Sequence, residues 1–195
     1  MKTSISAIVI AAILFAACNN NNSSVKENKN TEGDSTSQSK MRTDNATEQK
    51  TKGSIDDILS GYLQLKNALT NDNGNEAAEA GKAIVQTMSK IDRSVFNAEQ
   101  LKAYDDISGD LKENAEHIGD NAGKIAHQRE HFEILSTDIY DLLKVFKANE
   151  TLYKDFCPMV NDGKGAYWIS EIKEIKNPYQ GKKMPTCGSV KEEIK

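Results

Sequence analysis

The sequence predicts an all-α domain, an up-down four-helix bundle with an irregular, Cys- and Met-containing C-terminal segment packed on it. Apolar residues recur at helical spacing in four segments between residues 55 and 146. Short connections rich in Gly and Asn separate these segments, as they do between antiparallel neighbours in a bundle. No run of alternating β-branched residues occurs before residue 165, which argues against a sheet in the helical part.

Each helical segment has its own boundary signals. Ser54 and Asn97 precede the first and third segments as expected N-caps, because their side-chain oxygens can accept from the first free backbone N–H groups. The turn-forming stretch 71–74 ends the first segment, and the glycine-flanked stretch 119–123 ends the third. The apolar stripes run over residues 55–69, 77–91, 101–118 and 125–146.

The N-terminus has the composition of a secretory signal peptide, residues 1–17. Lys2 supplies a positive charge, and residues 5–17 are nearly all apolar but too few to span a bilayer, which needs about 20. Cys18 follows directly after small residues, in a stretch that resembles the lipobox of bacterial lipoproteins. We therefore expect a lipoprotein of the cell envelope, anchored at the outer membrane or periplasmic face through a lipid on Cys18. An ordinary secretory signal with an incidental cysteine is the alternative.

The remaining chain divides into a tether and a domain. Residues 18–53 are rich in Asn, Ser, Thr, Lys and Glu, so they bury too little apolar surface to fold and are expected to be a disordered tether. Residues 54–195 form the predicted domain, with a tail at 151–195. The net charge of −4 and the mixing of Lys with Glu leave no basic stripe, so we expect no nucleic-acid partner.

The tail carries the sulfur chemistry of the domain. It contains all three prolines and the single tryptophan, which predicts an irregular segment with a short strand near 167–169. Its sulfur side chains fall in two clusters, Cys157 with Met159 and Met184 with Cys187. Thiolate and thioether together favour Cu(I) and similar soft ions. In an exported protein the same two cysteines are also a candidate disulfide, and this alternative stays open.

Two histidines on the fourth helical segment add nitrogen donors. His127 and His131 lie four residues apart, on one flank of the helix, where a returning tail can meet them. We include both as metal ligands, with Trp168 as a cation–π neighbour and His117 as a solvated neighbour. With Glu130 they also match the H-x-x-E-H pattern of inverted zinc peptidases. A distal acidic ligand and a larger fold would be needed for that chemistry, so we expect no enzyme.

Several motifs together resemble domain-of-unknown-function family 3347. The motifs are residues 58–69, 115–118, 127–132, 135–136, 157–159, 163–168, 177–179 and 184–188. The resemblance implies lipoproteins of Bacteroidetes-type bacteria, and domains fused to membrane-fusion adaptors of Cus-type heavy-metal efflux pumps. The tail is also similar to short metal-binding modules that pair Cys-Pro-Met with a later Cys-Gly, although Val160 stands where those modules have histidine.

From these observations we expect a membrane-anchored envelope protein that binds a soft or heavy metal ion. Copper as Cu(I) is the first expectation and zinc the second. The protein would sequester the ion or hand it over to an efflux adaptor. The alternative is a disulfide-stapled helical module that docks on an efflux adaptor or another envelope protein without binding metal.

Overall fold

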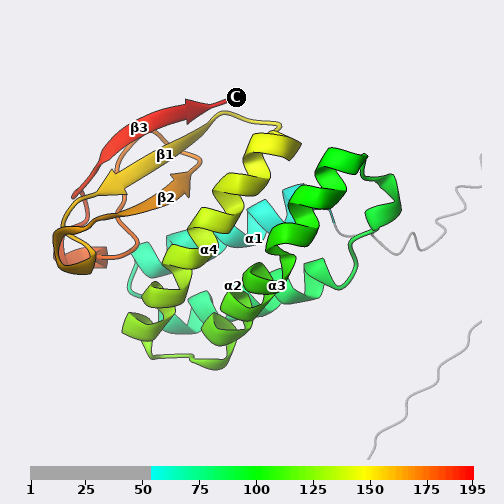
Figure 1. The fold of residues 1–195 in the computed structure, drawn as a ribbon. Coiled ribbons are helices and arrows are strands. Elements are labelled where there is room, and N and C mark those ends of the chain that lie inside the picture. The colour runs from blue at the N-terminus through cyan, green and yellow to red at the C-terminus, as the bar shows by residue number, and fades with distance from the viewer. Residues whose placement is uncertain (1–53) are drawn as a thin grey trace, which may run out of the picture. The chain divides into compact units, whose positions relative to one another are not determined.

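The computed structural model describes residues 54–195, so the predicted signal peptide, the lipidated Cys18 and the tether lie outside the described residues. Four helices come first, and a three-stranded sheet follows (Figure 1). The helices are α1 (Ile55–Thr70), α2 (Gly74–Met88), α3 (Ala98–Asp120) and α4 (Ile125–Phe146). The strands are β1 (Leu152–Cys157), β2 (Ala166–Ser170) and β3 (Ser189–Ile194), with short 3-10 turns at Arg93–Val95, Asn161–Gly163 and Gly181–Lys183.

The predicted helix starts are confirmed. Ser54 caps α1 in a capping box, in which its side chain accepts from the Asp57 N–H and the Asp57 carboxylate accepts in return. Asn97 caps α3 in the same way, with Gln100 as its partner. No helix in residues 54–195 is long and apolar enough to cross a membrane.

The all-α prediction is wrong, because the tail forms an antiparallel sheet of order β2-β1-β3. The central strand, β1, has the sequence Leu-Tyr-Lys-Asp-Phe-Cys and contains no β-branched residue. The edge strand β3 is mostly exposed and polar, so it lacks an apolar pattern. The expected strand near 167–169 does exist, as part of β2. Its pairing partners lie at Lys154–Phe156, outside the segment that the sequence marked as a strand.

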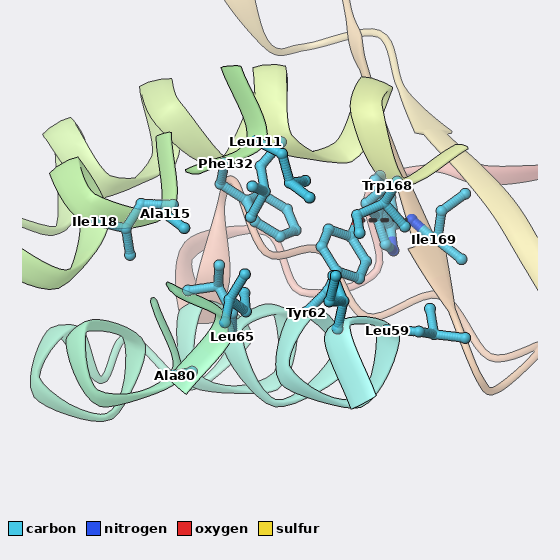
Figure 2. Packing of buried hydrophobic residues seen from close by; sticks show 14 of the residues in the cluster. Leu59, Tyr62, Leu65, Ala80, Leu111, Ala115, Ile118, Phe132, Trp168 and Ile169 are labelled. Carbon is cyan, nitrogen blue, oxygen red and sulfur yellow. Dashed lines mark hydrogen bonds between the residues drawn. The ribbon is translucent and has the colours of Figure 1, made fainter. Parts of the chain in front are cut away.

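The sheet packs on the helices through β2, which contacts both α4 and α1. Tyr62 of α1 stacks on Phe132 of α4 with 5.2 Å between ring centroids, and Figure 2 shows the two rings facing each other beside Trp168 and Ile169. The Tyr62 hydroxyl accepts from the backbone N–H of Ile169 at 2.9 Å and lies 2.8 Å from the Ser136 hydroxyl. These contacts hold β2 against both the first and the last helix.

Arg129 of α4 holds the tail in place. Its guanidinium donates to the carbonyl oxygen of Pro178 at 2.7 Å, to that of Leu69 at 2.9 Å and to the Asp72 carboxylate at 2.6 Å. Asp72 also accepts from the backbone N–H of Lys182 at 3.0 Å. The hydrogen bond from Arg129 is the main reason that the pKa of Asp72 is lowered. One side chain thus joins α4, the α1–α2 turn and the tail.

Candidate metal centre

The three histidines of the chain form one cluster between α3 and α4. His117 comes from α3, and His127 and His131 come from α4. One ligand nitrogen from each ring lies within 4.8 Å of the others. The His117 and His131 rings are stacked, with centroids 4.4 Å apart and an interplanar angle of 13°, while the His127 ring stands at 88° to that of His131. The sequence contains three histidines, and all three lie in this cluster.

The local fold explains why these positions meet. Only residues 121–124 separate α3 from α4, so the end of one helix lies beside the start of the next. The buried side chain of Gln128 fixes that arrangement, because its amide donates to the carbonyl oxygens of Ile118 at 3.1 Å and Gly74 at 2.8 Å. The i, i+4 spacing of the two α4 histidines places both rings on the side that faces His117.

Each of the two α4 histidines has a hydrogen-bond partner at its Nδ1 atom. His131 Nδ1 lies 2.9 Å from the side-chain oxygen of Asn114, and His127 Nδ1 lies 3.1 Å from a carboxylate oxygen of Glu130. His117 Nε2 is 3.9 Å from the carboxylate of Glu113. The Nδ1 atoms of both α4 histidines are therefore engaged with acceptors.

The electrostatics of the cluster favour a neutral ring at its inner position. Burial lowers the pKa of His131, and the neighbouring His117 and His127 lower it further because a second positive charge there is repelled. Glu130 and Glu113 act in the opposite direction. Neutral imidazole is the form that binds metal ions, so His131 is in the binding form at neutral pH.

The donor set fits a first-row transition metal. A tetrahedral zinc ion with bonds of about 2.0–2.1 Å would need its ligand nitrogens about 3.3 Å apart. That spacing is shorter than the 4.8 Å within which the three imidazole nitrogens lie here. The near-parallel His117 and His131 rings must therefore open slightly for their lone pairs to converge. The His117 side chain is 47% exposed and has room to turn. The arrangement is thus a near-assembled three-imidazole site.

His117 is the residue that sequence reasoning placed least well. We expected it to be a solvated neighbour of the site, and it is indeed exposed, but its ring contacts both other histidines. One feature of the sequence could have indicated its role. His117 stands shortly before the α3–α4 turn, and His127 stands shortly after it. A pair of antiparallel helices brings such positions together whether or not either one belongs to an apolar stripe.

The sulfur ligands gather at a different place. Cys157 and Cys187 are free thiols, the first buried and the second partly exposed. A hydrogen bond with Cys157 is the main reason that the pKa of the Cys187 thiol is raised, with burial adding to it. Met159 is 59% exposed and Met184 is 36% exposed. The two cysteines are therefore neighbours, and the methionines face solvent.

The tail meets α4 mainly on the flank that carries Arg129 and Glu133. Met159 shares a surface pocket with Arg129 and Glu133. Residues at positions i and i+2 of a helix lie about 160° apart around its axis. Arg129 and Glu133 are each two positions from His131, so they point away from it. Among residues 54–195, the group of His, Cys, Asp and Glu side chains close enough to share an ion consists of the three histidines alone. The structure thus separates the imidazole and sulfur ligands that the sequence analysis combined.

Trp168, expected beside the metal, lies in the core instead. Its side chain is fully buried, among the core residues drawn in Figure 2. It packs edge-on against Tyr179 with 6.1 Å between ring centroids. Its position follows from β2, which turns this residue toward the helices. Trp168 therefore joins the sheet to the core.

The fold and this cluster define a mixed α/β domain with a histidine site between two helices. Residues 58–151 match the model of a family described as "Protein of unknown function (DUF3347)", the family that the sequence motifs resemble. The matched range contains all three histidines and ends just before β1, so the Cys and Met clusters of the tail lie outside it. No curated protein and no solved structure matches the chain.

Proposed function

We propose that this protein is a metal-binding module of the cell envelope and that His117, His127 and His131 hold the ion. The observation that carries the proposal is the convergence of three imidazoles from two helices within 4.8 Å. The acceptors beside both Nδ1 atoms of the α4 histidines support it, since partners of this kind usually orient imidazole ligands. The lowered pKa of His131 favours the neutral form that binds metal ions.

Copper, as Cu(I), is our first choice of metal and zinc the second. Imidazole suits both metals, whereas thiol and thioether groups favour Cu(I). The neighbouring thiols of Cys157 and Cys187, with exposed Met159 and Met184 in the same segment, offer a second and separate place for a soft ion. Two sites of different softness in one small domain suit a protein that takes up an ion and passes it on.

The cellular role that we propose follows from the sequence. A lipid on Cys18 would hold the domain at the membrane, and the tether would let it reach a heavy-metal efflux adaptor. In that role the domain would sequester the ion or hand it to the adaptor. Catalysis forms no part of the proposal.

The test is a titration of the tag-free, reduced domain with Cu(I) against a competing chelator, and separately with Zn(II). We expect about one equivalent to be bound by imidazole. The double variant His117→Ala with His131→Ala should lose that equivalent, because a single imidazole remains. Glu116→Ala is the matched control, since this exposed α3 residue adjoins His117 and pairs with Lys112.

The same titration tests the sulfur site with a separate variant. Cys157→Ser with Cys187→Ser should keep the imidazole equivalent and lose only a second, softer one. If the wild-type domain binds neither Cu(I) nor Zn(II) with its thiols reduced or oxidised, the metal proposal falls. The docking module that binds no metal is then the better account.

A further inference from the structure

Asn114 is a buried polar residue beside the histidine cluster, and the structure leaves its amide one orientation. It lies on α3 and is 6% exposed. Its Nδ2 donates to the backbone carbonyl oxygen of Asp110 at 2.8 Å. A carbonyl oxygen can only accept, so the amide nitrogen must face it. The side-chain oxygen of Asn114 therefore faces the other way, 2.9 Å from His131 Nδ1.

This orientation decides the protonation of His131. An amide oxygen has no hydrogen to donate, so the hydrogen bond forms only when His131 Nδ1 carries the proton. A neutral ring with its proton on Nδ1 has its lone pair on Nε2, so Nε2 is the atom free to bind a metal ion. The stack with His117 holds the plane of the ring.

We propose that Asn114 is a positioning residue that holds His131 in the Nδ1–H form and presents Nε2 to the metal. This inference rests on the proposed function, because it specifies which atom of that site binds. Glu130 does the same for His127 less firmly, since its carboxylate is 3.1 Å from Nδ1 but the side chain is 73% exposed. The contrast between a buried amide and an exposed carboxylate makes His131 the fixed member of the site.

The first test reads the tautomer in the metal-free protein by nitrogen-15 NMR of the three imidazoles. In the wild type we expect His131 Nε2 to show the chemical shift of an unprotonated nitrogen and Nδ1 that of a protonated one. Asn114→Ala removes the acceptor and should move His131 toward a mixture of tautomers. Asn114→Asp keeps an acceptor and should preserve the Nδ1–H form. A wild-type His131 that carries its proton on Nε2 would overturn the inference.

The second test measures affinity for Zn(II) and Cu(I) in the same proteins. Loss of an outer-shell partner of this kind weakens metal binding by about 10- to 100-fold, and we expect that loss for Asn114→Ala. Asn114→Asp should retain most of the affinity. Asn149→Ala, which follows the far end of α4 and bonds to Asp56, is the matched control and should bind as the wild type does.

The outcomes separate the two claims. A wild type that binds metal, together with an Asn114→Ala variant that binds equally well, overturns the positioning role and leaves the proposed function standing. A wild type that binds neither ion overturns the proposed function whatever the tautomer of His131. Circular dichroism of each variant shows whether the helices are intact, and Asn114→Asp keeps the inference testable if the alanine variant is unstable.

Discussion

The contact between α2 and α3 at Gly81 allows a sharp test of the packing. A methyl group at this position would lie 2.7 Å from the carbonyl oxygen of Ala115 and 3.0 Å from the backbone nitrogen of Gly119. Both are backbone atoms, so no side chain can move aside. At Gly109, in the middle of α3, a methyl group would meet no atom within 4 Å apart from the adjoining backbone of its own helix, so Gly109 is the matched control.

The two alanine substitutions should have opposite effects on the free energy of unfolding. Replacing glycine by alanine in a helix favours folding by about 1 kcal/mol, and Gly109→Ala should show most of this gain. Overpacking costs about 1–3 kcal/mol in well-packed cores, and the overlap at Gly81 is with rigid backbone, so Gly81→Ala should lose about 1–2 kcal/mol net. Ala115 and Gly119 flank His117, so the displacement should also reach the histidine cluster.

Thermal unfolding followed by circular dichroism measures both effects. For a domain of this size, 1 kcal/mol corresponds to a shift in Tm of about 2–4 °C. We expect the Tm of Gly109→Ala to rise and that of Gly81→Ala to fall. Equal stabilisation by both substitutions would refute the close approach of α2 and α3 and the geometry built on it.

Three further predictions concern charge, the tail and the anchor. Burial raises the pKa of Asp138 and of Asp155 to about 7, so the folded protein keeps protons that the unfolded chain releases above about pH 4. The stability that these two protonated carboxyl groups contribute is full below about pH 4 and is lost as the pH rises to about 7. The Asp155→Asn protein does not titrate at this position, so its free energy of unfolding in urea should rise relative to that of the wild type over the same pH range. Arg129→Ala should lower the free energy of unfolding by about 2–4 kcal/mol, because two carbonyl oxygens and Asp72 lose a charged donor, and Arg129→Lys should restore only part of it. Cys18→Ala should move the protein from the membrane to the soluble envelope fraction, and a variant that stays in the membrane fraction would contradict the lipoprotein interpretation.

The helices could be predicted because their signals are local. The caps at Ser54 and Asn97 act within three residues, and the apolar stripes follow a period that the chain itself sets. The sheet could not be predicted in this way. The central strand pairs Leu152 with Ile194, and its stability depends on partners far along the chain.

The histidine site shows the same division. The sequence by itself determined that His127 and His131 share a helix face, since the spacing of four residues requires it. It also marked Cys157 and Cys187 as candidate partners, and these thiols are neighbours in the structure. It also combined the sulfur and imidazole groups in one site, whereas the structure gathers the three histidines without a cysteine. The path of the tail depends on the contacts of Arg129 with Pro178 and with Asp72 in the α1–α2 turn.

Only the tertiary structure decided that His117 belongs to the site and that Asn114 faces His131. Both depend on the rotation of α3 about its axis and on its register against α4, and these are set by packing at Gly81 and by the hydrogen bonds of Gln128. A helical wheel shows which residues of one helix share a face. The relative position of two helices is set by contacts among side chains far apart in the sequence, and a pattern read along one segment does not contain it.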